Sequence, residues 1–157
     1  MNLISIISLA IVIAASILLI VYSIKSKRKK ENKKLQLLSA IADKHNCKIT
    51  KHEFFGDLLI GLDEKSNFLF FINNSNNKME QAVNLSEIQK CRVVSTSRTV
   101  NSITVIDKLE LCFSPADKNK PQVFLEFYNS DNSPTLVGEL QLIEKWAEIV
   151  NNQLKKN

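Results

Sequence analysis

The stretch KLELCFSPADKNKPQVFLEFY, residues 108–128, decides the fold of this chain. In its first half Leu109, Leu111 and Phe113 alternate with polar or smaller side chains, and residues 122–128 repeat the pattern. Between the two halves lies a turn-forming segment with two prolines. Alternation of this kind is typical of antiparallel strands that bury one face. The stretch therefore predicts two strands joined by a turn.

Working outward from this pair, similar short runs fill the chain between Cys47 and Lys108. Segments rich in Asn, Asp and Ser, such as residues 73–77, separate them and mark turns. The seven predicted strands are 49–55, 57–62, 68–72, 80–85, 90–97, 103–113 and 122–128. Strands spaced this closely favour an antiparallel meander that curls into a small barrel or a sandwich.

The chain closes with GELQLIEKWAEIVNNQL, in which apolar residues recur at three- and four-residue steps. The central stripe comprises Leu140, Ile143, Ala147, Val150 and Leu154. Leu142, Trp146 and Ile149 widen this stripe into a face broad enough to cover a sheet or the mouth of a barrel. The sequence thus predicts an α+β fold, in which a β-domain is capped by a C-terminal amphipathic helix.

Seven strands followed by one helix bearing Trp146, over residues 49–154, resemble the pleckstrin-homology-like domain superfamily. The whole chain resembles small uncharacterised single-pass bacterial membrane proteins with such a domain. Phosphoinositide-binding members of the superfamily carry a Lys-x-Arg-like cluster beside the first loop between strands. The corresponding loop here, residues 63–67, holds two acids and one base. The resemblance therefore implies an architecture, and it implies neither headgroup recognition by this loop nor an activity.

Residues 3–24, LISIISLAIVIAASILLIVYSI, contain no charge, Gly or Pro. As a helix this segment is about 33 Å long, enough to cross a hydrocarbon core of about 30 Å. The alternative is a cleaved signal peptide, which needs a basic segment before a shorter apolar stretch. Met1 and Asn2 supply no basic side chain. We therefore expect a transmembrane anchor.

A basic segment, KSKRKKENKK, follows at residues 25–34. Its basic residues are Lys25, Lys27, Arg28, Lys29, Lys30, Lys33 and Lys34. Excess Lys and Arg beside an apolar helix holds that side in the cytoplasm and attracts anionic headgroups. The predicted location is the cell inner membrane, crossed once, with the amino terminus outside and the domain cytoplasmic.

The rest of the chain is close to neutral. The whole chain carries +5; residues 25–34 hold seven bases and one acid, which gives +6 and leaves −1 for the remainder. A nucleic-acid-binding domain carries its basic surface on the domain itself. We therefore expect no nucleic-acid partner.

The predicted organisation is a transmembrane helix at 1–24, a stop-transfer segment at 25–34, a connecting helix at 35–46 and the domain at 47–157. Leu35, Leu38 and Ala42 fall at helical spacing in the connecting segment. The spacing leaves open whether this helix packs on the domain or forms a stalk.

The segment CRVVSTSRTVNS, residues 91–102, is the candidate anion site of the domain. Arg92, Ser95, Ser97 and Arg98 have the donors that bind a phosphate or carboxylate. The alternative is a polar edge strand whose arginines are solvated or paired with neighbouring acids.

The residues typical of catalysis or metal binding are sparse. The chain has two His, and it lacks the GxSxG, Walker A, HExxH and GxGxxG motifs. Cys47, Cys91 and Cys112 have no metal-binding spacing, and we expect buried, reduced thiols. The sequence predicts no catalytic residue, metal or cofactor.

Together these features favour a non-enzymatic, membrane-tethered interaction module that docks a protein partner. The alternative hypothesis is a sensor of an anionic ligand or lipid headgroup, using Arg92, Arg98 and the lysines of the basic segment.

Overall fold

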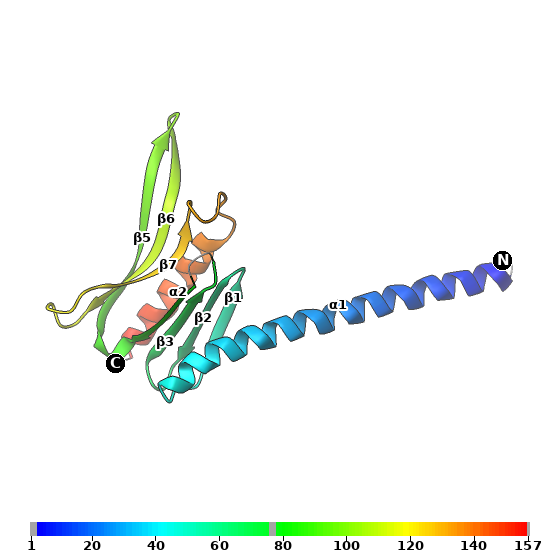
Figure 1. Ribbon diagram of the computed structural model, residues 1–157, viewed down its shortest axis with the longest axis horizontal. Coiled ribbons are helices and arrows are strands. Elements are labelled where there is room, and N and C mark those ends of the chain that lie inside the picture. The colour runs from blue at the N-terminus through cyan, green and yellow to red at the C-terminus, as the bar shows by residue number, and fades with distance from the viewer. Residues whose placement is uncertain (1–2, 76–77, 157) are drawn as a thin grey trace. The chain divides into compact units, whose positions relative to one another are not determined.

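Two compact units make up the chain. The structure, a computed structural model, describes residues 3–75 and 78–156. The first unit is Met1–Gln36 and the second is Leu37–Asn157. Helix α1 (Leu3–Lys44) contributes to both units, and the second unit also contains seven strands and helix α2 (Figure 1). The second unit thus begins before Cys47, the predicted start of the domain.

The first part of α1 is the predicted apolar helix. No Gly or Pro interrupts it, and the hydroxyl of Ser16 donates to the carbonyl oxygen of Val12 at 2.8 Å, which satisfies a polar group within the helix. All side chains at positions 7–24 are exposed. Within the described residues, α1 is the one helix that is long and apolar enough to cross a membrane.

Four antiparallel strands form the first sheet, in the order β1-β2-β3-β4. Their bounds are β1 (Lys51–Phe55), β2 (Leu58–Asp63), β3 (Phe68–Asn73) and β4 (Met79–Asn84). Phe55 pairs with Leu58, so the β1–β2 turn contains only Gly56 and Asp57. Gly56 has φ +55°, a conformation that costs a glycine little.

Strands β2 and β3 are buried on both faces, because different elements cover the two sides. One face packs into the main core, and the other contacts Leu38, Ile41 and Ala42 of α1. Gly61 of β2 makes this close approach possible, since a Cβ there would lie 2.6 Å from Cδ2 of Leu38. The last turns of the connecting helix therefore pack on the domain and do not form a free stalk.

Three antiparallel strands form the second sheet, in the order β5-β6-β7. A 3₁₀ turn, η1 (Leu85–Glu87), leads from β4 into β5 (Ile88–Val100), which is followed by β6 (Ile103–Pro115) and β7 (Val123–Asn129). Strand β7 pairs only with residues 108–113 of β6. The remaining end of the β5–β6 hairpin, residues 97–107, projects beyond β7 and is called the arm (Figure 1).

Helix α2 (Glu139–Leu154) covers the core that the two sheets share. Its buried apolar residues are Leu142, Ile143, Trp146, Ala147 and Val150, the face that the sequence pattern predicts. Trp146 is only 1% exposed. Side chains from both sheets meet this helix face in one cluster, which includes Ile60, Phe71 and Leu111.

The observed architecture confirms the α+β class, the antiparallel strands and the C-terminal helix. The seven strands form two sheets. The predicted strand at 90–97 is too short, because β5 extends to Val100. Thr99 and Val100 pair with Thr104 and Ile103 across the arm, where β-branched side chains favour a strand despite the polar neighbours.

Candidate functional site

The seven basic side chains of residues 25–34 lie in α1 directly after the apolar segment. A helix turns by about 100° per residue, so these positions spread around its whole circumference over about 14 Å. All are exposed except Lys34, which is half-buried. The predicted membrane-surface residues therefore form one ring of positive charge, which is called the basic collar.

The four residues of the predicted anion site all lie in β5. Arg92, Ser95 and Ser97 are exposed, and no ion pair to Arg92 exists among the residues that the structure describes. Nε of Arg98 lies 3.2 Å from Oδ1 of Asp107, across the arm. Arg98 thus adopts the alternative considered from the sequence, an arginine paired with a neighbouring acid.

These four side chains do not converge on one point. Arg92 and Arg98 are six residues apart in an extended strand, a distance of about 20 Å. Successive side chains of a strand point to opposite faces, so Ser95 and Ser97 lie on the face opposite Arg92 and Arg98. The strand therefore does not bring the four predicted residues to one point, because spacing in sequence carries no information about convergence.

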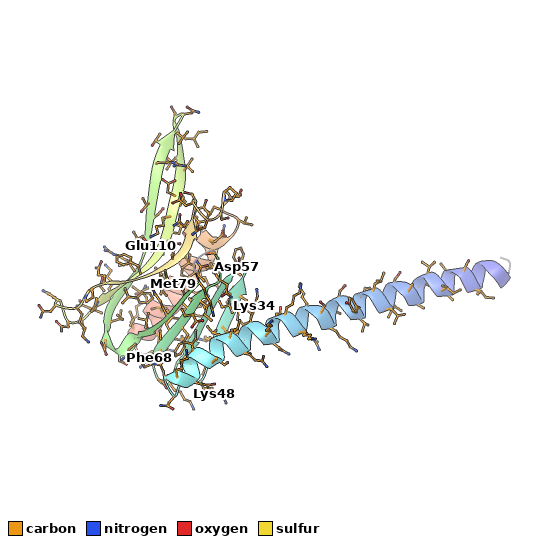
Figure 2. The ribbon with its side chains drawn as sticks, in the orientation of Figure 1. Lys34, Lys48, Asp57, Phe68, Met79 and Glu110 are labelled. Carbon is orange, nitrogen blue, oxygen red and sulfur yellow. The ribbon has the colours of Figure 1, made fainter. Side chains whose placement is uncertain are left out.

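The structure instead reveals a cavity of about 250 Å³ where the β1–β2 turn meets the ends of β3 and β7 and the segment before α2. Asp57, labelled in Figure 2, lies in the β1–β2 turn and lines this cavity. The wall residues are Phe55, Gly56, Asp57, Leu58, Asn73, Ser75, Glu126, Phe127, Tyr128, Asn129, Asn132, Ser133 and Glu139. Three acidic and three aromatic residues thus line the cavity, and none of the described lining residues is Lys, Arg or His.

Two contacts hold the elements around this cavity in place. Nδ2 of Asn73 donates to the carbonyl oxygen of Glu126 at 3.1 Å, which ties the first sheet to the second. The ring of Phe55 packs against Gly138, where a Cβ would lie 2.7 Å from Cζ. The segment before α2 is therefore fixed to β1 by a contact that only a glycine permits.

The three carboxylates of the cavity have different partners. Nζ of Lys108 lies 3.2 Å from Oε2 of Glu126, and Oε2 of Glu139 accepts the backbone N–H groups of Val137 and Gly138 at 2.8 and 3.0 Å. The side chain of Asp57 has no hydrogen bond or ion pair among the described residues. Negative charge in the cavity is therefore only partly compensated.

None of the cysteines and histidines described in the structure lines this cavity. Cys47, Cys91 and Cys112 are free and buried, as the sequence predicts. Burial, with a smaller contribution from Cys112, raises the pKa of Cys91 to about 12, so this thiol stays protonated at neutral pH. His45 and His52 are exposed and lie beside phenylalanine rings, with centroids 5.0–5.9 Å apart. No group of three His, Cys, Asp or Glu is arranged for a metal ion within the described residues.

The residues of the cavity were not found from the sequence. Asp57, Glu126 and Glu139 are far apart in the chain, and each occupies an ordinary position: a turn, an outward strand position and the first turn of a helix. No local pattern links three such positions. Only the pairing of β1 with β2 and the docking of α2 place them around one space.

Comparison with known proteins gives this chain no relative: no family model, no curated protein and no solved structure matches it.

Proposed function

We propose that the chain is a non-enzymatic, single-pass membrane protein whose cytosolic domain docks a protein partner at the membrane. One observation carries the proposal. An exposed apolar helix of membrane-spanning length is followed at once by the basic collar, and the same chain then forms a compact domain. A membrane tether raises the effective concentration of the domain at the bilayer, so that even a weak partner is bound there.

The charge distribution supports a topology with the amino terminus outside and the domain in the cytoplasm of the inner membrane. Seven bases lie on the carboxyl side of the apolar segment, and residues 3–24 and the two positions before them carry no charged side chain. The alternative is a cleaved signal sequence, which is also an apolar helix near the amino terminus. Cleavage of the chain near residues 20–25, or activity of a reporter that works only outside the cytoplasm, would overturn this topology.

The architecture of the second unit supports a pleckstrin-homology-like fold. Four antiparallel strands, three more and one closing helix with a buried Trp146 follow the element order of that superfamily. The arm adds a strand edge without a neighbour and the exposed side chains of Val100, Ile103 and Val105. An exposed strand edge is one of the recurring means by which a domain binds an extended peptide.

The second candidate is a sensor of an anionic ligand or headgroup. The observation that favours it is the exposed Arg92, which has no ion pair among the described residues, together with the basic collar. In this candidate Arg92 acts with neighbours other than Arg98, because the extended strand separates the two arginines by about 20 Å. Binding of anionic vesicles or inorganic phosphate that is lost in Arg92→Ala would favour this candidate over protein docking.

The test of the main proposal is proximity labelling in cells. A labelling enzyme is fused after Asn157 of the full chain, and the control carries the same enzyme directly after residue 36. We expect at least one protein to be labelled by the full chain and not by the anchor alone. Identical labelling by both proteins would overturn docking by the domain.

A further inference from the structure

The cavity beside Asp57 has a charge and a shape that indicate its ligand. We propose that it binds one alkylammonium or guanidinium group, presented as a Lys or Arg side chain by the docked partner. This inference rests on the proposed function and gives the chemistry of the partner. The cavity lies in the part of the chain that has no net positive charge, since the net positive charge lies in the basic collar.

The charge balance of the wall supports a cation. Lys108 compensates Glu126, and it also contacts Glu110 at 2.7 Å. Hydrogen bonding to Glu110, with a contribution from Glu126, raises the pKa of Lys108 despite its partial burial, so it stays charged. Asp57 and Oε1 of Glu139 have no such partner in the described part of the chain. A carboxylate that lacks a donor gains a charge-assisted hydrogen bond when an ammonium or guanidinium enters.

Tyr128 is a second, independent sign of a ligand. This residue is only 6% exposed, and its hydroxyl has no hydrogen-bond partner among the described residues. Tyr128 is one of the residues that line this cavity. A hydroxyl on a largely buried side chain normally has a partner. A bound N–H donor supplies one.

The aromatic side chains suit the same ligand. Phe55, Phe127 and Tyr128 line the cavity. The face of an aromatic ring attracts a cation, and the attraction grows when the cation is partly removed from water. The carboxylates are not arranged as metal ligands, which favours an organic cation over a metal ion.

The size of the cavity favours one side chain. Its volume is about 250 Å³, below the 300–1,000 Å³ that is typical of sites for drug-sized ligands. A nucleotide or a large cofactor exceeds this space, whereas a Lys or Arg side chain fits. The Asn73–Glu126 hydrogen bond and the Phe55–Gly138 contact hold the elements around the cavity in place.

The experiment measures binding to the full chain in zwitterionic micelles by amide chemical shifts at constant ionic strength. The probes are the peptide acetyl-Gly-Lys-Gly-amide, the same peptide with its lysine acetylated, and butylammonium chloride. We expect the lysyl peptide and butylammonium to shift the amides of Asp57 and Tyr128, and the acetylated peptide to leave them unchanged. Equal shifts with the acetylated peptide would overturn a cation site. Shifts with butylammonium alone would overturn a partner side chain as the occupant.

Matched variants locate the binding. Asp57→Asn should weaken the affinity for the lysyl peptide about tenfold, the effect of one charge-assisted hydrogen bond. Tyr128→Phe should weaken it about fivefold. Asp131→Asn removes the same charge from an exposed neighbour that does not line the cavity, and should change the affinity less than twofold. An equal loss in Asp131→Asn and Asp57→Asn would show nonspecific attraction and overturn the site.

The two proposals fail separately. If the lysyl peptide binds but the full chain labels no more proteins in cells than its anchor, the docking function is wrong and the cavity chemistry stands. If a partner is labelled but no probe binds, and Asp57→Asn leaves that labelling unchanged, the cation site is wrong and the docking function stands.

Discussion

Nε1 of Trp146 donates a hydrogen bond of 3.0 Å to Oε2 of Glu53, a residue 93 positions earlier in the chain. Nζ of Lys145 lies 2.8 Å from the same oxygen. One carboxylate of β1 thus holds the middle of α2, and the last element of the fold is fixed to the first strand. The indole ring itself is buried in the shared core.

Trp146→Ala should therefore reduce the free energy of unfolding by about 3–5 kcal/mol, the usual result of deleting a large buried ring. Trp146→Phe keeps most of the ring and loses the hydrogen bond to Glu53, so the loss should be smaller, about 1–2 kcal/mol. Urea denaturation followed by circular dichroism measures both. Since the chain has one Trp, native fluorescence also reports its burial, and emission typical of indole in water would contradict the structure.

Gly61→Ala should be destabilising although alanine is small. Its Cβ would lie 2.6 Å from Cδ2 of Leu38 and 3.1 Å from Cδ1 of Ile49, and overpacking of this kind costs about 1–3 kcal/mol. The double variant Gly61→Ala with Leu38→Ala should lose less free energy of unfolding than the sum of the two single losses. The reason is that Leu38→Ala removes the atoms with which the new Cβ clashes. Full additivity in urea denaturation would contradict the packing of α1 on β2.

Asp63 should make the stability depend on pH in the acid range. Burial raises the pKa of its carboxyl, but N–H groups of Lys48, Ser66 and Lys65 donate to it at 2.8–3.1 Å and together hold the pKa below the ordinary value. Because the pKa of Asp63 is lower in the folded than in the unfolded chain, its ionised carboxylate stabilises the fold. This contribution is complete above the pKa in the unfolded chain, about 3.9, and is lost as the pH falls through the pKa in the folded chain.

Asp63→Asn should therefore lose about 1–3 kcal/mol near neutral pH, and its stability should fall less steeply below about pH 4 than that of the parent chain. Unfolding by urea at a series of pH values measures this. Asp117→Asn is the control, since Asp117 accepts one backbone N–H in an exposed turn. Parallel pH profiles for Asp63→Asn and the parent chain would contradict the assigned role.

The basic collar should give the chain a salt-dependent affinity for anionic membranes. Each Lys or Arg near such a surface contributes about 1 kcal/mol. The fragment 25–157 should bind anionic vesicles at about 0.01 M salt and release them at about 0.15 M, where the Debye length falls from about 30 to about 8 Å. The matched fragment 37–157 keeps the helix residues that pack on the domain, lacks the collar, and should bind poorly throughout. Vesicle co-sedimentation measures the binding. Strong co-sedimentation of the shorter fragment would show that the domain itself binds the membrane.

The sequence predicts the elements of this fold better than their contacts. The alternation around Leu111 and the apolar stripe around Trp146 are local patterns, and such patterns predict the strands and the C-terminal helix. The continuous apolar runs at 58–62 and 68–72 are typical of strands buried on both faces. These runs do not indicate which element covers the second face. In the structure, residues 37–44 of α1 cover it.

The candidate site was less predictable for the same reason. Arg92 and Arg98 are near in sequence, yet an extended strand separates them by about 20 Å. Asp57 and Glu139 are distant in sequence, yet they line one cavity. Convergence of side chains depends on the pairing and packing of elements, which residue spacing alone does not encode.

The arm should open on a shorter timescale than the rest of the unit unfolds. Its turn, Asn101 and Ser102, has two positive φ angles of 49° and 65°, and residues 97–107 have no third strand and little core beneath them. Strand β3, in contrast, has a neighbour on each side and buried faces. Amide protons of the arm should therefore exchange with solvent through local openings of low free energy, while those of β3 exchange only when the unit unfolds. The arm can open and close repeatedly during the lifetime of a single folded molecule, and a strand edge that is transiently free in this way adapts to a second chain without unfolding the rest.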